Sequence, residues 1–268
     1  MIIGVTSLGD RIYVVCTCSN VIAVFTSHQP FRRLQDIVVH GLLYATDIAA
    51  SANTSCLYVP DLQSCSVWRV NVDSGAVVQW LSVVGAWAVS VTSGDRIVLL
   101  VVVDVQCDDD GRLTWRSEVH VCSSEAVTEA IVKLSPYIKS PHSVVMTTRK
   151  TFVVSHGHQE DEMHRVCEVD MTGRVLKSFG STPGNGVGQL HIPVCVSLDD
   201  KERVIVADAD NDRVLLLNKQ LTSPRVLATW RPQPDDDTGS PRRLHYDSHT
   251  GSLLVGLWRG HIDIYKLN

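Results

Sequence analysis

The sequence predicts an all-β fold, a six-bladed β-propeller of four-stranded antiparallel blades, and two observations lead to this prediction. Short apolar runs alternate with turns rich in Asp, Asn, Gly and Ser along all 268 residues, which is the pattern of strands joined by tight turns. Groups of such runs recur at intervals of roughly 40 to 55 residues, a spacing typical of propeller blades. Because one blade cannot bury both faces of its sheet, a ring of neighbours is required.

Six units account for the chain in order. They span approximately residues 2-40, 45-83, 86-134, 141-180, 190-230 and 240-268 of a single domain, 1-268. We expect the strands of the first three units to include residues 2–5, 12–15, 21–25, 57–61, 67–70, 86–89, 97–103 and 119–121. Those of the last three are expected to include residues 141–145, 152–154, 166–169, 193–199, 204–208, 211–217, 241–246, 253–256 and 262–265.

The last unit is expected to be shorter than the others. It stops after its third apolar run, residues 262–265, whereas the unit before it has a fourth at residues 226–230. We therefore predict that the last blade lacks its outer strand. Because natural proteins seldom leave a sheet edge unpaired, we also expect the chain to be a fragment or the C-terminal module of a longer product.

The fifth unit, within residues 184–217, contains the most specific motif. A Gly-rich stretch leads to a strand that begins at Pro193, the next strand ends in an Ala-Asp pair at Asp208, and Asn211 opens an Asn-x-Arg step that ends at Arg213. This unit resembles an NHL repeat, in which these features follow one another in the same order. The other units share only its topology. We expect Asp208 and Asn211 to bond backbone amides and Arg213 to pair with a carboxylate, so that Asp208 and Arg213 are structural blade residues.

Composition points to one folded domain in the cytoplasm. The chain is 44% apolar and 20% charged, which suffices for a large core. Nothing near Met1 resembles a signal peptide, and the longest apolar run, residues 97–103, is about a third of a membrane span. Most of the eight cysteines stand singly, as in proteins of a reducing compartment. We expect a cytoplasmic protein without membrane or DNA partners.

No motif for nucleophilic catalysis or phosphate binding occurs, so we expect no catalytic residue, no cofactor and no metal. One cluster of histidines leaves an alternative open. His156, His158 and His164 lie on one expected loop, and His142 and His191 could join His156 from adjacent blades. Some propeller enzymes that resemble NHL repeats bind metal through histidines of different blades. A metal-dependent lyase or hydrolase is therefore an alternative function.

One face of the propeller is expected to hold the binding residues. In NHL-like propellers the loops that lead into first strands and those that link second to third strands share a face, here called the top face. Trp258 with Arg259 is the preferred anchor, because exposed Trp and Arg are typical of binding hot spots; the alternative is that Trp258 packs between blades. The partner-binding candidates on the top face are Trp87, His142, His156, His158, His191, Asp210, Asn211, Arg242, Trp258 and Arg259.

The resemblance implies two kinds of partner. NHL propellers either bind single-stranded RNA or recruit protein substrates beneath an N-terminal RING and B-box, as in tripartite-motif proteins. Neither zinc module is in this chain. RNA binding needs a basic face with aromatic side chains, whereas the net charge is −5 and aromatic residues make up 6%. We therefore predict a non-catalytic protein-interaction platform, the substrate-recruiting or partner-recruiting module of a ubiquitin-ligase-type protein, with a single-stranded RNA-binding propeller as the alternative.

Three arrangements of side chains distinguish these functions. A continuous basic patch of Arg242, Arg243 and Arg259 favours RNA binding. Three converging histidines favour a metal-dependent enzyme. A polar-rimmed face centred on Trp258 favours a protein partner.

Overall fold

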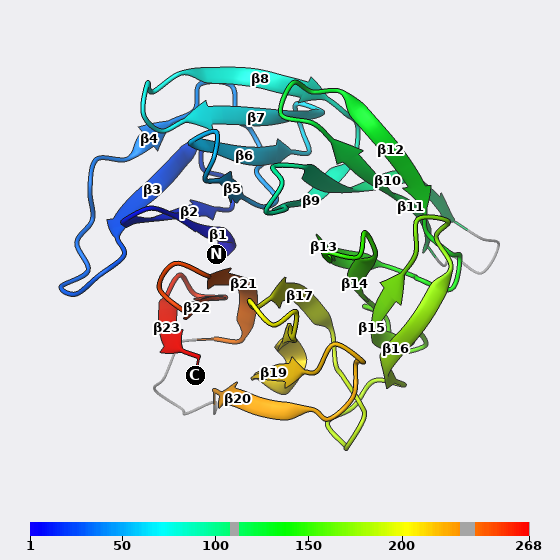
Figure 1. The fold of residues 1–268 in the computed structure, drawn as a ribbon. Coiled ribbons are helices and arrows are strands. Elements are labelled where there is room, and N and C mark those ends of the chain that lie inside the picture. Colours follow the sequence, from blue (N-terminus) through cyan, green and yellow to red (C-terminus); the bar gives the residue numbers. More distant parts are fainter. Residues whose placement is uncertain (108–112, 231–238, 268) are drawn as a thin grey trace.

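The computed structural model describes residues 1–107, 113–230 and 239–267. Six antiparallel sheets stand around a central axis, each with one strand next to the axis (Figure 1). The prediction of a six-bladed β-propeller is confirmed. The described residues include a short 3-10 helix, Ala209–Asn211, and no helix among them is long and apolar enough to cross a membrane.

The first three sheets follow the predicted units. The first blade consists of β1 (Ile2–Leu8), β2 (Arg11–Cys16), β3 (Val21–Thr26) and β4 (Ile37–Val38). The second consists of β5 (Ala49–Ser51), β6 (Cys56–Asp61), β7 (Ser66–Asn71) and β8 (Val77–Ser82). The third consists of β9 (Ala86–Val91), β10 (Ile97–Cys107), β11 (Leu113–Cys122) and β12 (Thr128–Lys133). Strand β10 is longer than expected, since its backbone pairs with β11 as far as Cys107.

The last three sheets include the incomplete blade. The fourth blade consists of β13 (Pro141–Met146), β14 (Phe152–His156), β15 (His164–Val169) and β16 (Val175–Ser181). The fifth consists of β17 (Pro193–Leu198), β18 (Val204–Asp208), β19 (Arg213–Leu217) and β20 (Arg225–Thr229). The sixth has three strands, β21 (Pro241–Asp247), β22 (Ser252–Leu257) and β23 (Ile262–Lys266), and no strand of the described residues pairs with the outer edge of β23. The prediction that the last blade lacks its outer strand is confirmed.

The inner strands form a ring, and this ring defines two faces. Strands β1, β5, β9, β13, β17 and β21 each contact the next, and β21 contacts β1. Because the chain passes through every blade from the inner strand outward, the inner strands run in the same direction. The loops before inner strands and those between second and third strands therefore share the top face. The loops after inner strands and those between third and fourth strands share the opposite face, here called the bottom face.

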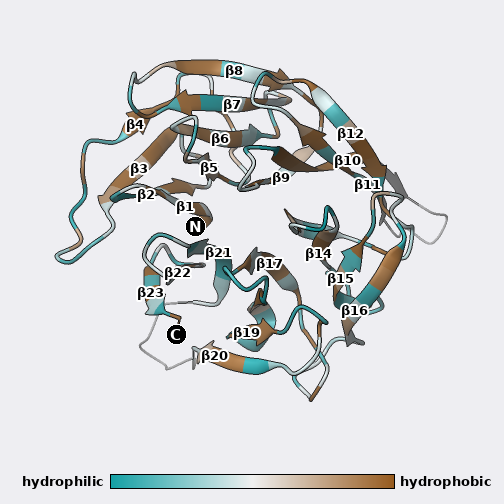
Figure 2. Ribbon diagram, in the orientation of Figure 1, coloured by the Kyte–Doolittle hydropathy of each residue, from teal (hydrophilic) through white to brown (hydrophobic). Residues whose placement is uncertain are grey.

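The apolar core lies between neighbouring blades. Every residue of β6, β14 and β22 is buried, because the second strand of each sheet has a neighbouring sheet on both sides, and Figure 2 shows apolar colouring along such strands. Val153 of the fourth blade, for example, packs in one cluster with Val206 and Leu217 of the fifth. The outer strands are less buried, since Val226 of the outer strand β20 is exposed. This arrangement leaves the loops and the axis to provide functional surfaces.

A residue with positive φ recurs in the turn after every inner strand. At Gly9 and Gly251 this conformation has little cost, because glycine has no Cβ. An L-residue there is strained by about 1 kcal/mol. The six φ angles lie between 51° and 62°, at Gly9, Ser55, Asp95, Lys150, Glu202 and Gly251. The blades thus share a turn geometry although four of them lack the glycine that favours it.

The sixth and first blades meet without sharing a strand, and this interface is here called the closing seam. Strand β1 pairs with β2 of its own blade. Across the seam, the Arg243 guanidinium donates to the carbonyl oxygens of Ile3 and Thr46. It also lies 3.7 Å from the Asp47 carboxylate. One half-buried side chain of the sixth blade thereby contacts both the first and the second blade.

Apolar packing and a histidine complete the closing seam. Ile2 packs in one cluster with Leu254, and a Cβ on Gly256 would lie only 2.9 Å from the Ile2 side chain, so this glycine permits close approach of the two blades. A ring nitrogen of His245 lies 2.9 Å from the Ser7 hydroxyl. Burial lowers the pKa of His245 to about 4, so the ring is neutral near neutral pH. The ring of blades is therefore closed by side-chain contacts.

Candidate functional site

The NHL-like residues of the fifth blade bond to one another and to the preceding Gly-rich loop. The Arg213 Nε lies 2.6 Å from the buried Asp208 carboxylate. Asp208 also accepts the backbone N–H of His191 at 2.6 Å. Asn211 differs from the expectation, because its side-chain amide donates to Asp208 at 2.8 Å and to the carbonyl of Gly184 at 2.9 Å. These contacts fix the loop before β17 against the turn after β18, which is a structural role.

Three of the candidate partner-binding residues meet where the fifth and sixth blades adjoin on the top face. The Arg242 guanidinium lies 4.4 Å above the centroid of the Trp258 ring, and its Nη2 is 4.0 Å from the Asp210 carboxylate. Trp258 is 44% exposed, so it does not pack between the blades. Arg259 is exposed in the same turn as Trp258. A cation held over an aromatic face presents a flat apolar surface with a charged edge.

Four histidines of the top face form two pairs instead of one cluster. The rings of His142 and His158 lie edge to face with centroids 5.7 Å apart, and those of His164 and His191 are stacked at 5.5 Å. Burial, with the nearby His158, lowers the pKa of His142 to about 3. Within the described part of the chain, no three His, Cys, Asp or Glu side chains are arranged so that they could hold a metal ion. The three-histidine convergence of the enzyme alternative is thus not seen among these residues.

His164, which is not among the partner-binding candidates, joins the fourth blade to the fifth. Its Nδ1 accepts the backbone N–H of Ile192 at 3.0 Å. The other ring nitrogen must then have the proton, and it donates to the carbonyl of Gln159 at 3.0 Å. Burial lowers the pKa of His164. This neutral imidazole orients the chain just before β17.

Two further candidates belong largely to the core between blades. His156 is 2% exposed, and its Nε2 lies 3.4 Å from the thiol of Cys167. Burial lowers the pKa of His156 to about 4 and raises that of Cys167 to about 12. Trp87 is half-buried against the apolar cluster of the third and fourth blades. His156 is the last residue of the buried strand β14 and not a loop residue, a distinction that the sequence pattern alone could not make.

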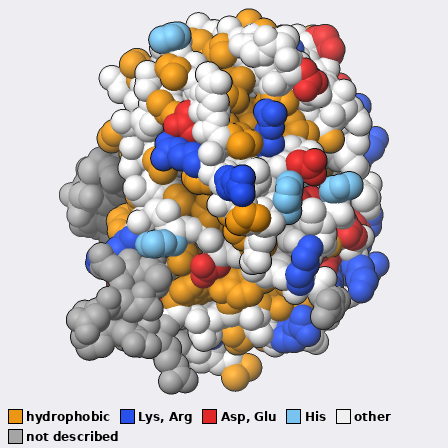
Figure 3. All heavy atoms as spheres, turned by 90° about the vertical axis from the view of Figure 1, so that its left-hand side faces the viewer, with side chains coloured by type: hydrophobic (Ala, Val, Ile, Leu, Met, Phe, Trp, Pro, Cys, Tyr) orange, Lys and Arg blue, Asp and Glu red, His pale blue; other side chains and the backbone are white. Residues whose placement is uncertain are grey.

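The three arginines of the RNA alternative do not share one surface. Arg242 stacks on Trp258, Arg259 is exposed beside it, and Arg243 extends into the closing seam with 15% of its side chain exposed. On the side of the molecule seen in Figure 3, Lys and Arg side chains lie scattered among acidic and apolar ones. The continuous basic patch that favours RNA is thus not formed by these three residues.

Comparisons with known proteins identify the architecture. No family model matches the chain, and no curated protein sequence matches it. Among solved structures it is similar to the hydrazine synthase of Kuenenia stuttgartiensis, with 10% identity and a TM-score of 0.66 over 99% of this chain and 95% of that one. It is also similar to a protein of unknown function from Bacteroides caccae, with 12% identity and a TM-score of 0.64 over 92% and 82%. It is similar as well to a chain of a nidogen/laminin complex, with 12% identity and a TM-score of 0.63 over 86% of this chain and 80% of that one. At such identities the likeness shows the propeller fold alone.

Sequence reasoning missed a set of apolar residues on the top face. They lie in loops that lead into inner strands, and Tyr137 is 87% and Val84 72% exposed. The sequence did hold a signal, because each is a large apolar residue inside a Gly, Pro or Ser-containing turn, where polar residues are usual. The exposed members of this set are Leu43, Tyr44, Val84, Tyr137 and Val187.

Proposed function

We propose that this propeller is a non-catalytic platform that binds a protein partner through its top face. The observation behind this proposal is the set of exposed apolar residues on the loops before the inner strands, together with the Trp258–Arg242 stack at the same face. Exposed apolar residues that stand alone are common, whereas a contiguous patch of them marks an interaction site, and in this proposal the loop residues of the top face form such a patch. Tyr and Trp with a neighbouring Arg are also the residue types that dominate binding energy at protein interfaces.

The electrostatic character of this face supports a protein partner over RNA. The net charge is −5, and Arg242 is held between Trp258 and Asp210. RNA affinity comes chiefly from Lys and Arg that neutralise phosphates. The acidic Asp210 at the centre of this contact opposes that role, whereas a protein partner benefits from mixed charge around an apolar centre.

The proposed family and cellular role of the chain rest on the fifth blade. Its Gly-rich loop, Asp208, Asn211 and Arg213 resemble an NHL repeat, and on that resemblance we place the chain among NHL-type propellers in the cytoplasm. In this proposal the chain recruits a substrate or partner for a ubiquitin-ligase-type protein whose zinc modules lie outside this sequence. Identification of the bound partner tests the proposed role in a ubiquitin-ligase-type protein.

The test is a selection of random peptides displayed on phage against the purified chain, followed by titration of an enriched peptide. We expect Trp258→Ala and Tyr137→Ala each to weaken its binding by roughly tenfold or more. Val127→Ala is the matched control, because Val127 is equally apolar and 60% exposed but lies on the bottom face. Enriched peptides whose affinity is the same for Trp258→Ala, Tyr137→Ala and the unchanged chain contradict the proposal.

A parallel measurement addresses RNA. The chain is incubated with a randomised single-stranded RNA pool and passed over a filter, at physiological and at reduced ionic strength. We expect no retention at physiological ionic strength. Retention that persists there and is lost in the Arg242→Glu, Arg259→Glu double variant identifies the top face as an RNA reader and overturns the proposal.

A further inference from the structure

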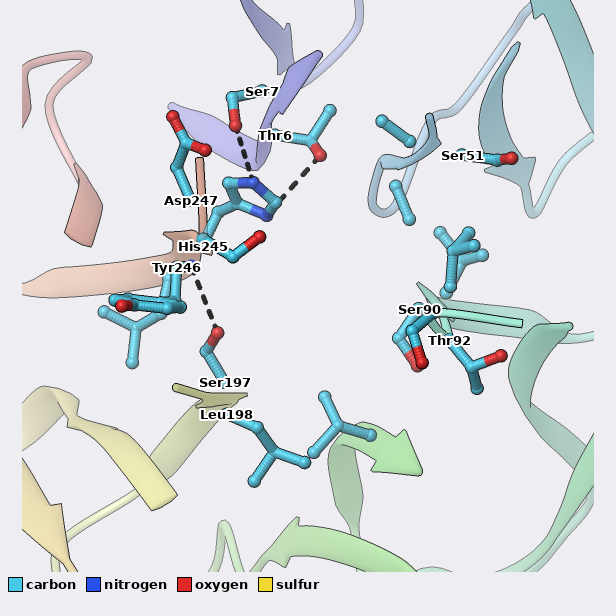
Figure 4. Close-up of a pocket in the computed structure, with 18 of the residues that line it drawn as sticks. Thr6, Ser7, Ser51, Ser90, Thr92, Ser197, Leu198, His245, Tyr246 and Asp247 are labelled. Carbon is cyan, nitrogen blue, oxygen red and sulfur yellow. Dashed lines mark hydrogen bonds between the residues drawn. The ribbon is translucent and has the colours of Figure 1, made fainter. Parts of the chain in front are cut away.

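A cavity of about 630 Å³ occupies the propeller axis on the side opposite the top face. Its wall is built from the second halves of the inner strands and the turns after them, with contributions from all six blades. Figure 4 shows Ser90 and Thr92 on one side of this space and Ser7 and His245 on another. The volume falls within the range of small-molecule sites. This space is here called the axial cavity.

The axial cavity is lined by acidic residues and by no Lys or Arg among the residues described. Six carboxylates line it, at Asp47, Asp95, Asp199, Asp200, Glu202 and Asp247. Two of the six have a cationic partner from outside the lining, since Arg203 lies 2.5 Å from Asp199 and Arg243 lies 3.7 Å from Asp47. The cavity therefore holds excess negative charge.

The remaining carboxylates are held in place by neutral donors. The Ser51 hydroxyl donates to Asp95 at 2.6 Å, and the Asn53 amide does so at 2.5 Å. The Tyr246 hydroxyl donates to Asp200 at 2.7 Å. These hydrogen bonds fix the positions of the acids and leave their charge in place.

Asp247 and Glu202 differ in whether nearby cationic side chains offset the charge of the carboxylate. Asp247 accepts the backbone N–H of His249 at 3.0 Å and the Thr250 hydroxyl at 2.7 Å, which are neutral donors. Glu202 accepts from the backbone and hydroxyl of Thr148, and its pKa is lowered by these bonds and by the more distant Arg149 and Lys219. Asp95, Asp200 and Asp247 are therefore the main uncompensated charges.

Hydroxyl groups supply the rest of the polar lining. Ser7 and Thr6 bond to His245, and Ser197 accepts the backbone N–H of Tyr246 at 3.2 Å. The Ser90 Oγ, on the opposite wall, is buried and has no hydrogen-bond partner in the structure.

The arrangement of the acids selects the class of ligand. The carboxylates belong to different blades, and no three of the described His, Cys, Asp or Glu side chains converge on a point where a metal ion could sit. Charge that is spread around a ring matches a flexible molecule with several separate cationic groups. We propose that the axial cavity binds an aliphatic polyamine, whose ammonium groups pair with Asp95, Asp200 and Asp247 while its methylene chain crosses the cavity.

Isothermal titration of the purified chain with spermidine tests this proposal, at low and at physiological ionic strength. We expect saturable one-to-one binding that weakens as salt is added. Asp95→Asn and Asp247→Asn should each weaken it by about five- to tenfold, because each removes one charge but keeps a hydrogen-bond acceptor. Glu125→Gln is the matched control, since Glu125 is an exposed acid of the bottom face outside the cavity lining. The affinity of this variant for spermidine should equal that of the unchanged chain.

Two other results would overturn the proposal. Absence of saturable binding at low ionic strength does so directly. Equal weakening by Glu125→Gln, Asp95→Asn and Asp247→Asn shows that spermidine merely associates with a negatively charged surface. Asp200→Asn provides a third variant if one of the others fails to fold, as judged by its thermal melt. Trp258→Ala must leave spermidine affinity unchanged, so failure here is distinguishable from failure of the proposed protein-binding face.

Discussion

The fifth and sixth blades are held in different ways. In the fifth, Asp208 bonds to Arg213 five residues away in the same turn. In the sixth, Arg243 reaches the carbonyl of Thr46, 197 residues away in the sequence, and His245 contacts Ser7 across the closing seam. The ion pair of the fifth blade thus acts within that blade, whereas these contacts of the sixth blade reach the first and second blades. These contacts come from the inner strand β21, so they hold the three-stranded blade in the ring, and the outer edge of β23 stays unpaired among the described residues.

The largest effect is expected in the fifth blade. Asp208→Ala leaves the half-buried Arg213 and two further donors without their buried acceptor, and we expect it to lower the free energy of unfolding by about 4 kcal/mol. Asp208→Asn retains an acceptor and should cost less. Urea denaturation measures both, with Asp210→Ala as a control on the exposed side of the same turn, where the change should stay within about 0.5 kcal/mol. Equal values for Asp208→Ala and Asp210→Ala would show that the buried ion pair is not stabilising.

Removal of the arginine at the closing seam is expected to have the next largest effect. Arg243→Met keeps most of the side-chain volume but removes the donors to Ile3 and Thr46 and the charge beside Asp47. We expect a loss of about 3 kcal/mol in the same denaturation experiment. Arg32→Met, at an exposed arginine of the first blade, should have little effect. A loss no greater than that of Arg32→Met would mean that apolar packing alone closes the ring.

The closing seam should also weaken in acid. His245 has a pKa of about 4 in the folded protein and about 6.5 when unfolded. Between these values the unfolded chain binds a proton that the folded chain does not, so stability from this group is present above pH 6.5 and is lost as the pH falls toward 4. We expect His245 to contribute a loss of about 2 kcal/mol between pH 7 and pH 5, measured as the difference between the unchanged protein and His245→Gln. Denaturation at both pH values should show a smaller loss for His245→Gln, and an identical loss would contradict this assignment.

The smallest effect concerns the turns. The blades at the closing seam have Gly9 and Gly251 at the left-handed position, whereas the fourth blade has Lys150 there with φ 62°. Lys150→Gly removes side-chain strain but adds freedom to the unfolded chain, so we expect a gain of about 0.5 kcal/mol. Thermal unfolding of Lys150→Gly against Lys139→Gly, a loop control, measures this difference. A loss of stability in Lys150→Gly would mean that the position is not strained.

Much of the fold could be predicted from the sequence because propeller strands coincide with apolar runs. The spacing of those runs fixed the number of blades, and the missing run after residues 262–265 predicted the three-stranded blade. The length of β10 was missed, since its pairing continues past Val103 into polar residues. Hydrogen bonding between backbones, unlike burial, does not require apolar side chains, so it extends a strand beyond its apolar run.

Less of the candidate site than of the fold could be predicted from the sequence. The meeting of Asp210, Arg242 and Trp258 agrees with their predicted place on one face, because loop positions follow from the strand order. The exposure of Tyr137 and Val84 could not be derived from residue type, since apolar side chains are usually buried. The acids of the axial cavity come from separate blades, and their distances depend on the radius of the ring.

The closing seam also bears on how the ring is assembled and how it yields to force. Within the described residues no strand crosses from the sixth blade to the first, so each sheet is one continuous stretch of chain and can form while later blades are still being synthesised. Closure then joins two finished sheets and places Ile2 against Leu254. We expect tension on the two chain ends to separate this interface first, because no connecting segment joins the sixth blade to the first.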